Sequence, residues 1–157
     1  MRNVFFPDEE VTSNDLRFVC YMIERTARHL KQPNKYVVNK MGKRELAERL
    51  SMANVQHAEN PDAVVHQWTE DNGLQTGNFN VLDTNPEYVD TPPTALQMGK
   101  VYARLIEQTM ESDENYADAI LRVYNSPICE IIDDYNSSAY YEPSYFIARA
   151  YYQGNFN

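Results

Sequence analysis

The chain has 157 residues, 43% of them apolar, and a formal net charge of −9 at pH 7. A chain of this length can bury roughly 68–70% of its surface on folding, and its apolar content argues against disorder. No apolar run in the sequence approaches the ~18 residues of a membrane span. We therefore expect a globular, cytoplasmic protein that has no membrane partner.

The charge is unevenly distributed along the chain. Residues 1–80 carry ten basic and eleven acidic side chains, whereas residues 81–157 carry four basic and twelve acidic ones. The two halves thus contribute −1 and −8 to the net charge. An acidic surface repels phosphates and attracts basic surfaces, so we expect no nucleic-acid partner and favour a basic protein partner.

The first half of the sequence predicts a series of helices. Apolar residues recur at helical spacing from Leu16 to Leu30, after the capping sequence TSND. The segment NKYVVNK predicts a short helix that Gly42 interrupts, and KRELAERLSMANVQH predicts another. The stretch NPDAVVHQWTEDNGL has Asn60 in position to begin a helix and Gly73 in position to follow its end.

The second half predicts a long loop and then four more helices. Residues 75–90 are polar and rich in turn-forming residues, with FNVL as a candidate short strand. Helical patterns follow in residues 91–110, 112–125, 126–136 and 143–154. We therefore predict an all-α fold, a compact array of about seven helices in a single domain, 1–157, with residues 1–12 as an irregular arm.

The sequence contains few of the residue patterns that carry chemistry. Cys20 and Cys129 lie in apolar helical patterns, where we expect reduced, buried thiols. Glu130, Asp133 and Asp134 form an acidic stripe that could hold a divalent cation, although a solvated helix face is the commoner interpretation. Zinc spacings, phosphate-binding loops and nucleophile motifs are missing, so we expect no metal, no cofactor and no catalytic residues.

Two groups of side chains nevertheless leave an enzymatic alternative open. Asp62, His66 and Glu70 recur every four residues on one predicted helix, as an acid–base row would. Arg25 and His29 lie one turn apart on the first helix, as in a helical phosphodiesterase or ribonuclease that neutralises phosphate and transfers a proton. Ordinary solvent-exposed helix faces would explain both groups equally well without any catalytic role.

The C-terminal segment is rich in tyrosine, and helical spacing divides it into two faces. Phe146, Ile147, Ala150 and Tyr151 fall on the side expected to pack on the core. Tyrosine and arginine are enriched at binding hot spots, so the remaining residues form a candidate partner-binding surface: Tyr140, Tyr141, Tyr145, Arg149 and Tyr152. Two alternatives remain for these five residues: they could lie at the edge of the core, with hydroxyl groups reaching water, or line a small-molecule pocket.

The segments FVCYMIERTARHL and LAERLSMANVQHAENP resemble a family of short, uncharacterised bacterial proteins that are encoded beside ADP-ribosyltransferase-like toxins. The similarity covers the first third to half of the chain and is carried by Phe18, Tyr21, Ile23, Glu24, Leu50 and His57. It implies a small partner-binding or neutralising protein, and it transfers no catalytic residues.

Together these observations favour a non-enzymatic, acidic, helical protein that acts by binding a protein partner, as an antitoxin does, or by self-association. The alternative is a hydrolase that uses Arg25 and His29 or the Asp62, His66 and Glu70 face.

Overall fold

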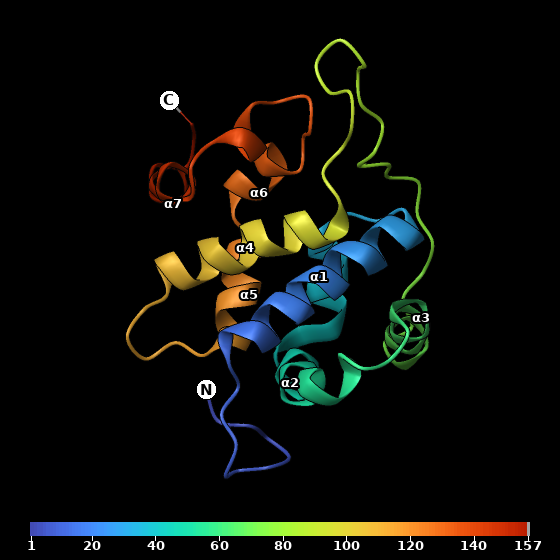
Figure 1. Cartoon of the computed structure of the whole chain (residues 1–157), viewed down its shortest axis with the longest axis vertical. Helices are drawn as coiled ribbons and strands as arrows, with labels where there is room; N and C mark the ends of the chain where they lie inside the picture. Colours follow the sequence, from blue (N-terminus) through green and yellow to red (C-terminus); the bar gives the residue numbers. More distant parts are fainter. Residues whose placement is uncertain (157) are drawn as a thin grey trace.

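The computed structural model describes residues 1–156 and contains seven α-helices and one short 3₁₀ helix, η1, within them (Figure 1). The helices are α1 (Ser13–Leu30), α2 (Asn34–Gln56), α3 (Pro61–Asp71), α4 (Ala95–Thr109), α5 (Tyr116–Tyr124), α6 (Pro127–Ile132), η1 (Ala139–Tyr141) and α7 (Ser144–Gln153). The predicted all-α class is confirmed. In the described part of the chain, no helix combines the length and the apolar character needed to cross a membrane.

Helix α1 lies at the centre of the fold. It packs on α4, α2 and α3, and Figure 1 shows α4 running alongside it at a shallow angle, with α3 on one side and α6 and α7 on the other. A capping box between Thr12 and Asp15 begins the helix, and Lys31 ends it in the left-handed conformation, with φ of 53°. Leu16, Val19 and Ile23 are fully buried along its length, as their helical spacing predicted.

Helices α1 and α4 approach each other closely at Gly99. A Cβ atom added there would stand 2.7 Å from the backbone nitrogen of Tyr21 and 2.8 Å from its Cα. Real side chains do not tolerate such a contact, so the helix crossing requires glycine at this position. The neighbouring Met98 and Tyr102 are fully buried, so this face of α4 belongs to the core.

Several of the predicted boundaries are confirmed. Gly42 interrupts α2 with non-helical backbone angles, φ 75° and ψ 174°. Asn60 caps α3 by accepting a hydrogen bond from the backbone N–H of Asp62, and Pro61 occupies the first position of that helix. Gly154 ends α7 in the left-handed region, with φ of 80°.

Two local predictions are wrong. Residues 79–82 form no strand, because the side chain of Asn80 accepts a hydrogen bond from the backbone N–H of Leu82 and turns the chain. Helix α6 ends at Ile132 and does not continue to residue 136. Tyr135 is nevertheless buried, as the helical pattern predicted, but from the turn after the helix.

The arm formed by residues 1–12 is non-helical but is held against the fold. Arg2 and Glu10 form an isolated antiparallel bridge. The buried side chain of Asn3 donates to the carbonyl oxygen of Ser51 on α2, at 2.8 Å. The arm leaves Phe5 and Phe6 about half exposed.

Replacing Gly99 by alanine tests the crossing of α1 and α4. In an uncrowded helix interior, Gly→Ala stabilises by roughly 1 kcal/mol through helix propensity. Here the contact with the Tyr21 backbone reverses the sign, and we expect Gly99→Ala to lower the free energy of unfolding by about 1–3 kcal/mol. Urea denaturation measures the effect, with the exposed Lys100→Ala as the control; a more stable Gly99→Ala variant would contradict the prediction.

Candidate functional site

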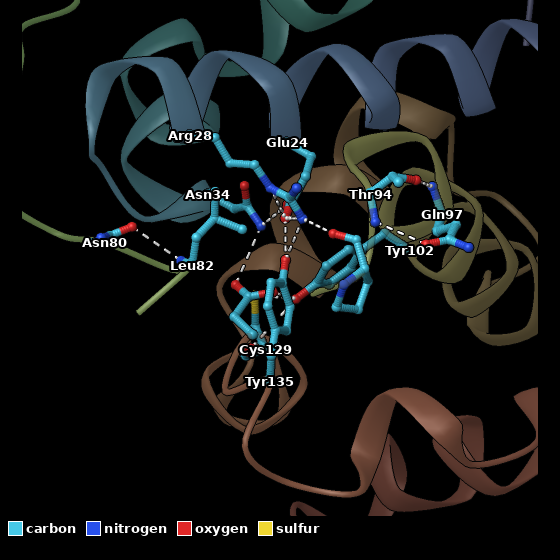
Figure 2. Close-up of polar contacts among 12 residues, drawn as sticks. Glu24, Arg28, Asn34, Asn80, Leu82, Thr94, Gln97, Tyr102, Cys129 and Tyr135 are labelled. Atoms are coloured by element: carbon cyan, nitrogen blue, oxygen red, sulfur yellow. Dashed lines mark hydrogen bonds and ion pairs between the residues drawn. The ribbon is translucent and has the colours of Figure 1, made fainter. Parts of the chain in front are cut away.

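A buried carboxylate, Glu24, lies at the centre of a polar network between α1 and the C-terminal half of the chain. Its side chain is 1% exposed. Three groups bind it: the Arg28 guanidinium at 3.1 Å, the Asn34 side-chain amide at 2.6 Å and the Tyr135 hydroxyl at 2.5 Å. Figure 2 shows these side chains converging from α1, α2 and the turn after α6. A carboxylate can be buried at tolerable cost only with such partners.

The Arg28 guanidinium connects this carboxylate to the loop before α4. It donates to the Pro93 carbonyl oxygen at 2.7 Å and to the Tyr135 hydroxyl at 2.8 Å. The Tyr135 hydroxyl thus accepts from Arg28 and donates to Glu24. One ion pair therefore fixes the position of α1 relative to two distant segments of the chain.

The network extends to a second carboxyl group, on Asp133. The Asn34 amide that binds Glu24 also donates to Asp133, at 3.3 Å. The Tyr102 hydroxyl of α4 donates to Asp133 at 2.6 Å and lies 3.0 Å from the Cys129 sulfur. We call these residues the Glu24 network: Glu24, Arg28, Asn34, Tyr102, Cys129, Asp133 and Tyr135.

Burial controls the protonation of this network. It raises the pKa of Asp133 to about 8, assisted by the negative charge of Glu24 and only partly offset by the Tyr102 hydrogen bond. Asp133 therefore holds its proton at neutral pH. Burial also raises the pKa of the Cys129 thiol well above its usual value, which disfavours the thiolate that a nucleophilic cysteine requires.

A pocket of about 820 Å³ lies over one side of the network. Cys129, Asp133 and Tyr135 contribute to its lining, together with residues of the loop that runs from Phe79 to Asp83. We call it the acidic pocket, because Asp83, Glu130 and Asp134 also line it. Its volume is within the range of pockets that bind small molecules.

The predicted acidic stripe is divided by the fold. Asp133 joins the Glu24 network, while Glu130 and Asp134 are exposed and Glu130 pairs with Lys35 at 3.2 Å. The interpretation of the stripe as one solvated face is therefore wrong for Asp133, because the chain turns inward at the end of α6. Within residues 1–156, no three His, Cys, Asp or Glu side chains are grouped so as to hold a metal ion.

The structure brings four of the five predicted acid–base residues together and leaves Glu70 outside the shared hollow. Arg25 and His29 of α1 and Asp62 and His66 of α3 line one open hollow of about 440 Å³. Arg25 pairs with Asp62 at 2.7 Å, and His66 lies 3.1 Å from Glu70. The hydrogen bond from Arg25 to Asp62 raises the pKa of the guanidinium.

The third histidine lies outside this hollow. His57 packs against Phe18 in the first half of α1, with ring centroids 4.6 Å apart and ring planes tilted by 33°. It does not line the hollow that His29 and His66 share. Only two of the three histidines could therefore act on one substrate there.

The predicted partner-binding residues lie on η1 and α7. Tyr141, Tyr145 and Tyr152 are 64%, 71% and 69% exposed, and Arg149 is exposed with its guanidinium 4.9 Å from the Phe146 ring centroid. Tyr140 is half-buried. We call this set, Tyr140, Tyr141, Tyr145, Arg149 and Tyr152, the tyrosine face.

The opposite side of α7 packs on the protein through three of the four predicted residues, while Phe146 is half-buried and lies under the exposed Arg149 guanidinium. Ile147 and Ala150 are buried. The Tyr151 hydroxyl accepts a hydrogen bond of 2.7 Å from Arg122 on α5, a guanidinium that also binds Glu114. The inner side therefore anchors α7, and the exposed tyrosines are not needed for that purpose.

The sequence interpretation missed the Glu24 network, although one signal for it was present. Glu24 lies between Cys20 and Ala27 at helical spacing, within the apolar face of α1. A carboxylate among core residues must find buried partners. Those partners lie as far as 111 positions away, at Tyr135, so the pattern could flag Glu24 but could not identify them.

Comparison of the chain with protein-family models, with curated proteins and with solved structures finds no match. The resemblance of the N-terminal half to toxin-associated bacterial proteins therefore stays a prediction.

The raised pKa of Asp133 predicts a pH-dependent stability. An unfolded Asp titrates near pH 4, so between about pH 4 and 8 the folded chain holds a proton that the unfolded chain has lost. As the pH rises through this window, the contribution of Asp133 to the free energy of unfolding should fall by at most about 1.4 kcal/mol per pH unit. The Asp133→Asn variant lacks this titration, so the wild-type free energy of unfolding should fall relative to that of the variant, and the difference should level off above pH 8.

Chemical denaturation at a series of pH values measures this difference. Asp134→Asn is the matched control, since Asp134 is the exposed neighbour. If plots of the free energy of unfolding against pH run parallel for wild type and Asp133→Asn from pH 4 to 8, Asp133 is already ionised in the folded protein and the prediction is wrong.

Proposed function

We propose that this chain is a non-enzymatic, cytoplasmic binding protein that recognises a protein partner with a basic surface and acts as an antitoxin-like neutraliser. The observation that carries the proposal is the exposure of Tyr141, Tyr145 and Tyr152 on the last two helical elements. Large aromatic side chains with a polar tip contribute much contact area at little entropic cost. The resemblance of the N-terminal half to toxin-associated proteins supports the neutralising role.

The charge of the chain supports a basic partner. The tyrosine face belongs to the half of the chain that carries −8. Such a charge speeds the encounter with a positively charged protein and disfavours acidic competitors. Self-association is the weaker alternative, because two copies of an acidic half repel each other.

Replacing residues of the tyrosine face by alanine tests this proposal. The binding partner in the test is the product of the neighbouring gene, purified separately. We expect Tyr145→Ala and Tyr152→Ala each to weaken its binding by about 1 kcal/mol or more, roughly fivefold in Kd, without unfolding the chain. Isothermal titration calorimetry measures binding, and size-exclusion chromatography with light scattering reports any self-association.

The matched control is Tyr88→Ala, because Tyr88 is 68% exposed in the loop before α4. Arg149→Ala probes the cationic residue of the tyrosine face. If both tyrosine variants and Arg149→Ala bind as tightly as wild type, the tyrosine face is not the interface. If wild type itself does not bind the neighbouring gene's product, the neutralising role is wrong.

A second candidate function follows from the hollow between α1 and α3. His29 and His66 line it together with Arg25, which are the residue types that a metal-independent phosphodiesterase uses for proton transfer and phosphate neutralisation. Arg25 is paired with Asp62 in an exposed ion pair. An anionic substrate could compete for Arg25, because exposed ion pairs are weak.

The double variant His29→Ala, His66→Ala tests this second function. Wild type should hydrolyse a single-stranded RNA oligonucleotide or bis(p-nitrophenyl) phosphate, and the double variant should lose about 100-fold of that rate through loss of general acid–base catalysis. His57→Ala, outside the hollow, should retain it. Absence of hydrolysis by wild type, or an unchanged rate in the double variant, would exclude the enzymatic function.

A further inference from the structure

The acidic pocket has an uncompensated negative charge. Three exposed carboxylates line it, on Asp83, Glu130 and Asp134. Among the described residues of the lining, Lys35 is the basic side chain, and it is paired with Glu130 at 3.2 Å. Desolvation and the negative charge of Glu24 raise the pKa of the partly buried Asp133 to about 8, so it adds little negative charge at neutral pH. At neutral pH the pocket therefore presents three carboxylates against one ammonium group, which favours a cation.

Apolar and aromatic side chains form another part of the lining. Phe79, at 43% exposure, belongs to the loop that lines one side of the pocket, and Val81 and Pro127 also line it. The face of an aromatic ring attracts ammonium and guanidinium groups, and the attraction increases when water is excluded. The pocket thus combines negative charge with surfaces suited to an apolar body.

The loop that lines the pocket is held in place at both ends. The backbone N–H groups of Gly77 and Phe79 donate to the carbonyl oxygens of Leu30 and Lys31, at 2.8 and 2.9 Å, where α1 ends. Further along, the backbone N–H of Asn85 donates to the side chain of Asn136 at 2.7 Å. A pre-formed pocket binds its ligand with little cost of ordering.

The lining includes a serine whose hydroxyl has no hydrogen-bond partner among residues 1–156. The Ser126 hydroxyl oxygen is buried and forms no hydrogen bond with the described part of the chain. Ser126 stands directly before α6 but its side chain does not cap that helix. Because buried hydroxyls are normally satisfied, the unpaired Ser126 hydroxyl of the lining is a candidate hydrogen-bonding group for a ligand.

From these observations we propose that the acidic pocket binds a small organic cation, with a primary ammonium or guanidinium group and an apolar body of about the size of a benzene ring. The carboxylates of Asp83, Glu130 and Asp134 attract the cationic group, Phe79 packs against it or against the apolar body, and Ser126 offers a hydrogen bond. The site shares no residue with the tyrosine face, so it does not depend on the proposed function.

Direct titration with small probes tests the proposal. Benzylamine and benzamidine supply the cation and the ring, benzyl alcohol is the neutral analogue and benzoate the anionic one. Isothermal titration calorimetry should give Kd values of about 1 mM or tighter for the cations. In ¹H–¹⁵N NMR spectra, adding the cations should shift the backbone amide resonances of Phe79, Asn80 and Val81.

A charge-matched pair of variants separates a specific site from general attraction. The triple variant Asp83→Asn, Glu130→Gln, Asp134→Asn should weaken binding of the cations about tenfold, the loss expected from removing partly screened attractions. The control triple Asp8→Asn, Glu9→Gln, Asp113→Asn removes the same charge from exposed positions outside the pocket. It should bind as wild type does.

Two further measurements define the chemistry of the ligand. Phe79→Leu keeps the apolar contact and removes the ring, so a loss of about threefold or more assigns a cation–π interaction. N-acetylarginine methylamide, compared with benzylamine, distinguishes an arginine side chain carried by a peptide from a free amine as the source of the cation.

The proposal is overturned by any of three results. The first is equal binding of benzyl alcohol, benzoate and benzylamine. The second is equal weakening by the pocket triple and the control triple. The third is the absence of amide shifts at Phe79, Asn80 and Val81 at saturating benzylamine or benzamidine, with circular dichroism confirming that each variant is folded.

Discussion

The structure depends on the burial of one carboxylate. Glu24 lies on the core face of the central helix, and its desolvation would be prohibitive without its three hydrogen-bonding partners. Those partners come from the same helix, from the start of α2 and from the turn after α6. Satisfying Glu24 therefore requires segments distant in sequence to meet around α1. Figure 2 shows that Arg28 and Tyr135 also bind each other, so the loss of one partner would disturb the others.

The same network determines where a pocket can form. Because Tyr135 turns inward toward Glu24 of α1 and Asp133 toward Tyr102 of α4, the chain after α6 bends away from a helical course. The loop from Phe79 to Asp83 lies opposite this bend, and the acidic pocket occupies the space between them. The pocket thus has a rigid polar side and an exposed carboxylate rim. A conformational change that opened the Glu24 network would alter the pocket as well.

The surface offers three separate places for function, and they differ in chemistry. The tyrosine face is aromatic and is suited to a protein surface. The acidic pocket is concave and negatively charged, and suits a small cation. The hollow between α1 and α3 combines histidines with an arginine and suits an anionic ester. Since each site uses different side chains, variants at one leave the others intact, and the three functions can be tested independently.

The sequence by itself determined the helical class, most helix boundaries and most of the division of α7 into a packed and an exposed side. These features follow from interactions within a few residues, such as the Thr12–Asp15 capping box, the break at Gly42 and the apolar spacing of α1. Only the tertiary structure decided which polar residues are buried and which separate groups meet. Glu24 and Tyr135 are 111 positions apart, and the hollow shared by α1 and α3 depends on how two helices pack. Local hydrogen bonding and periodicity determine where a helix begins, ends and turns its apolar side, but the partner of a buried charge is decided by the packing of the whole chain.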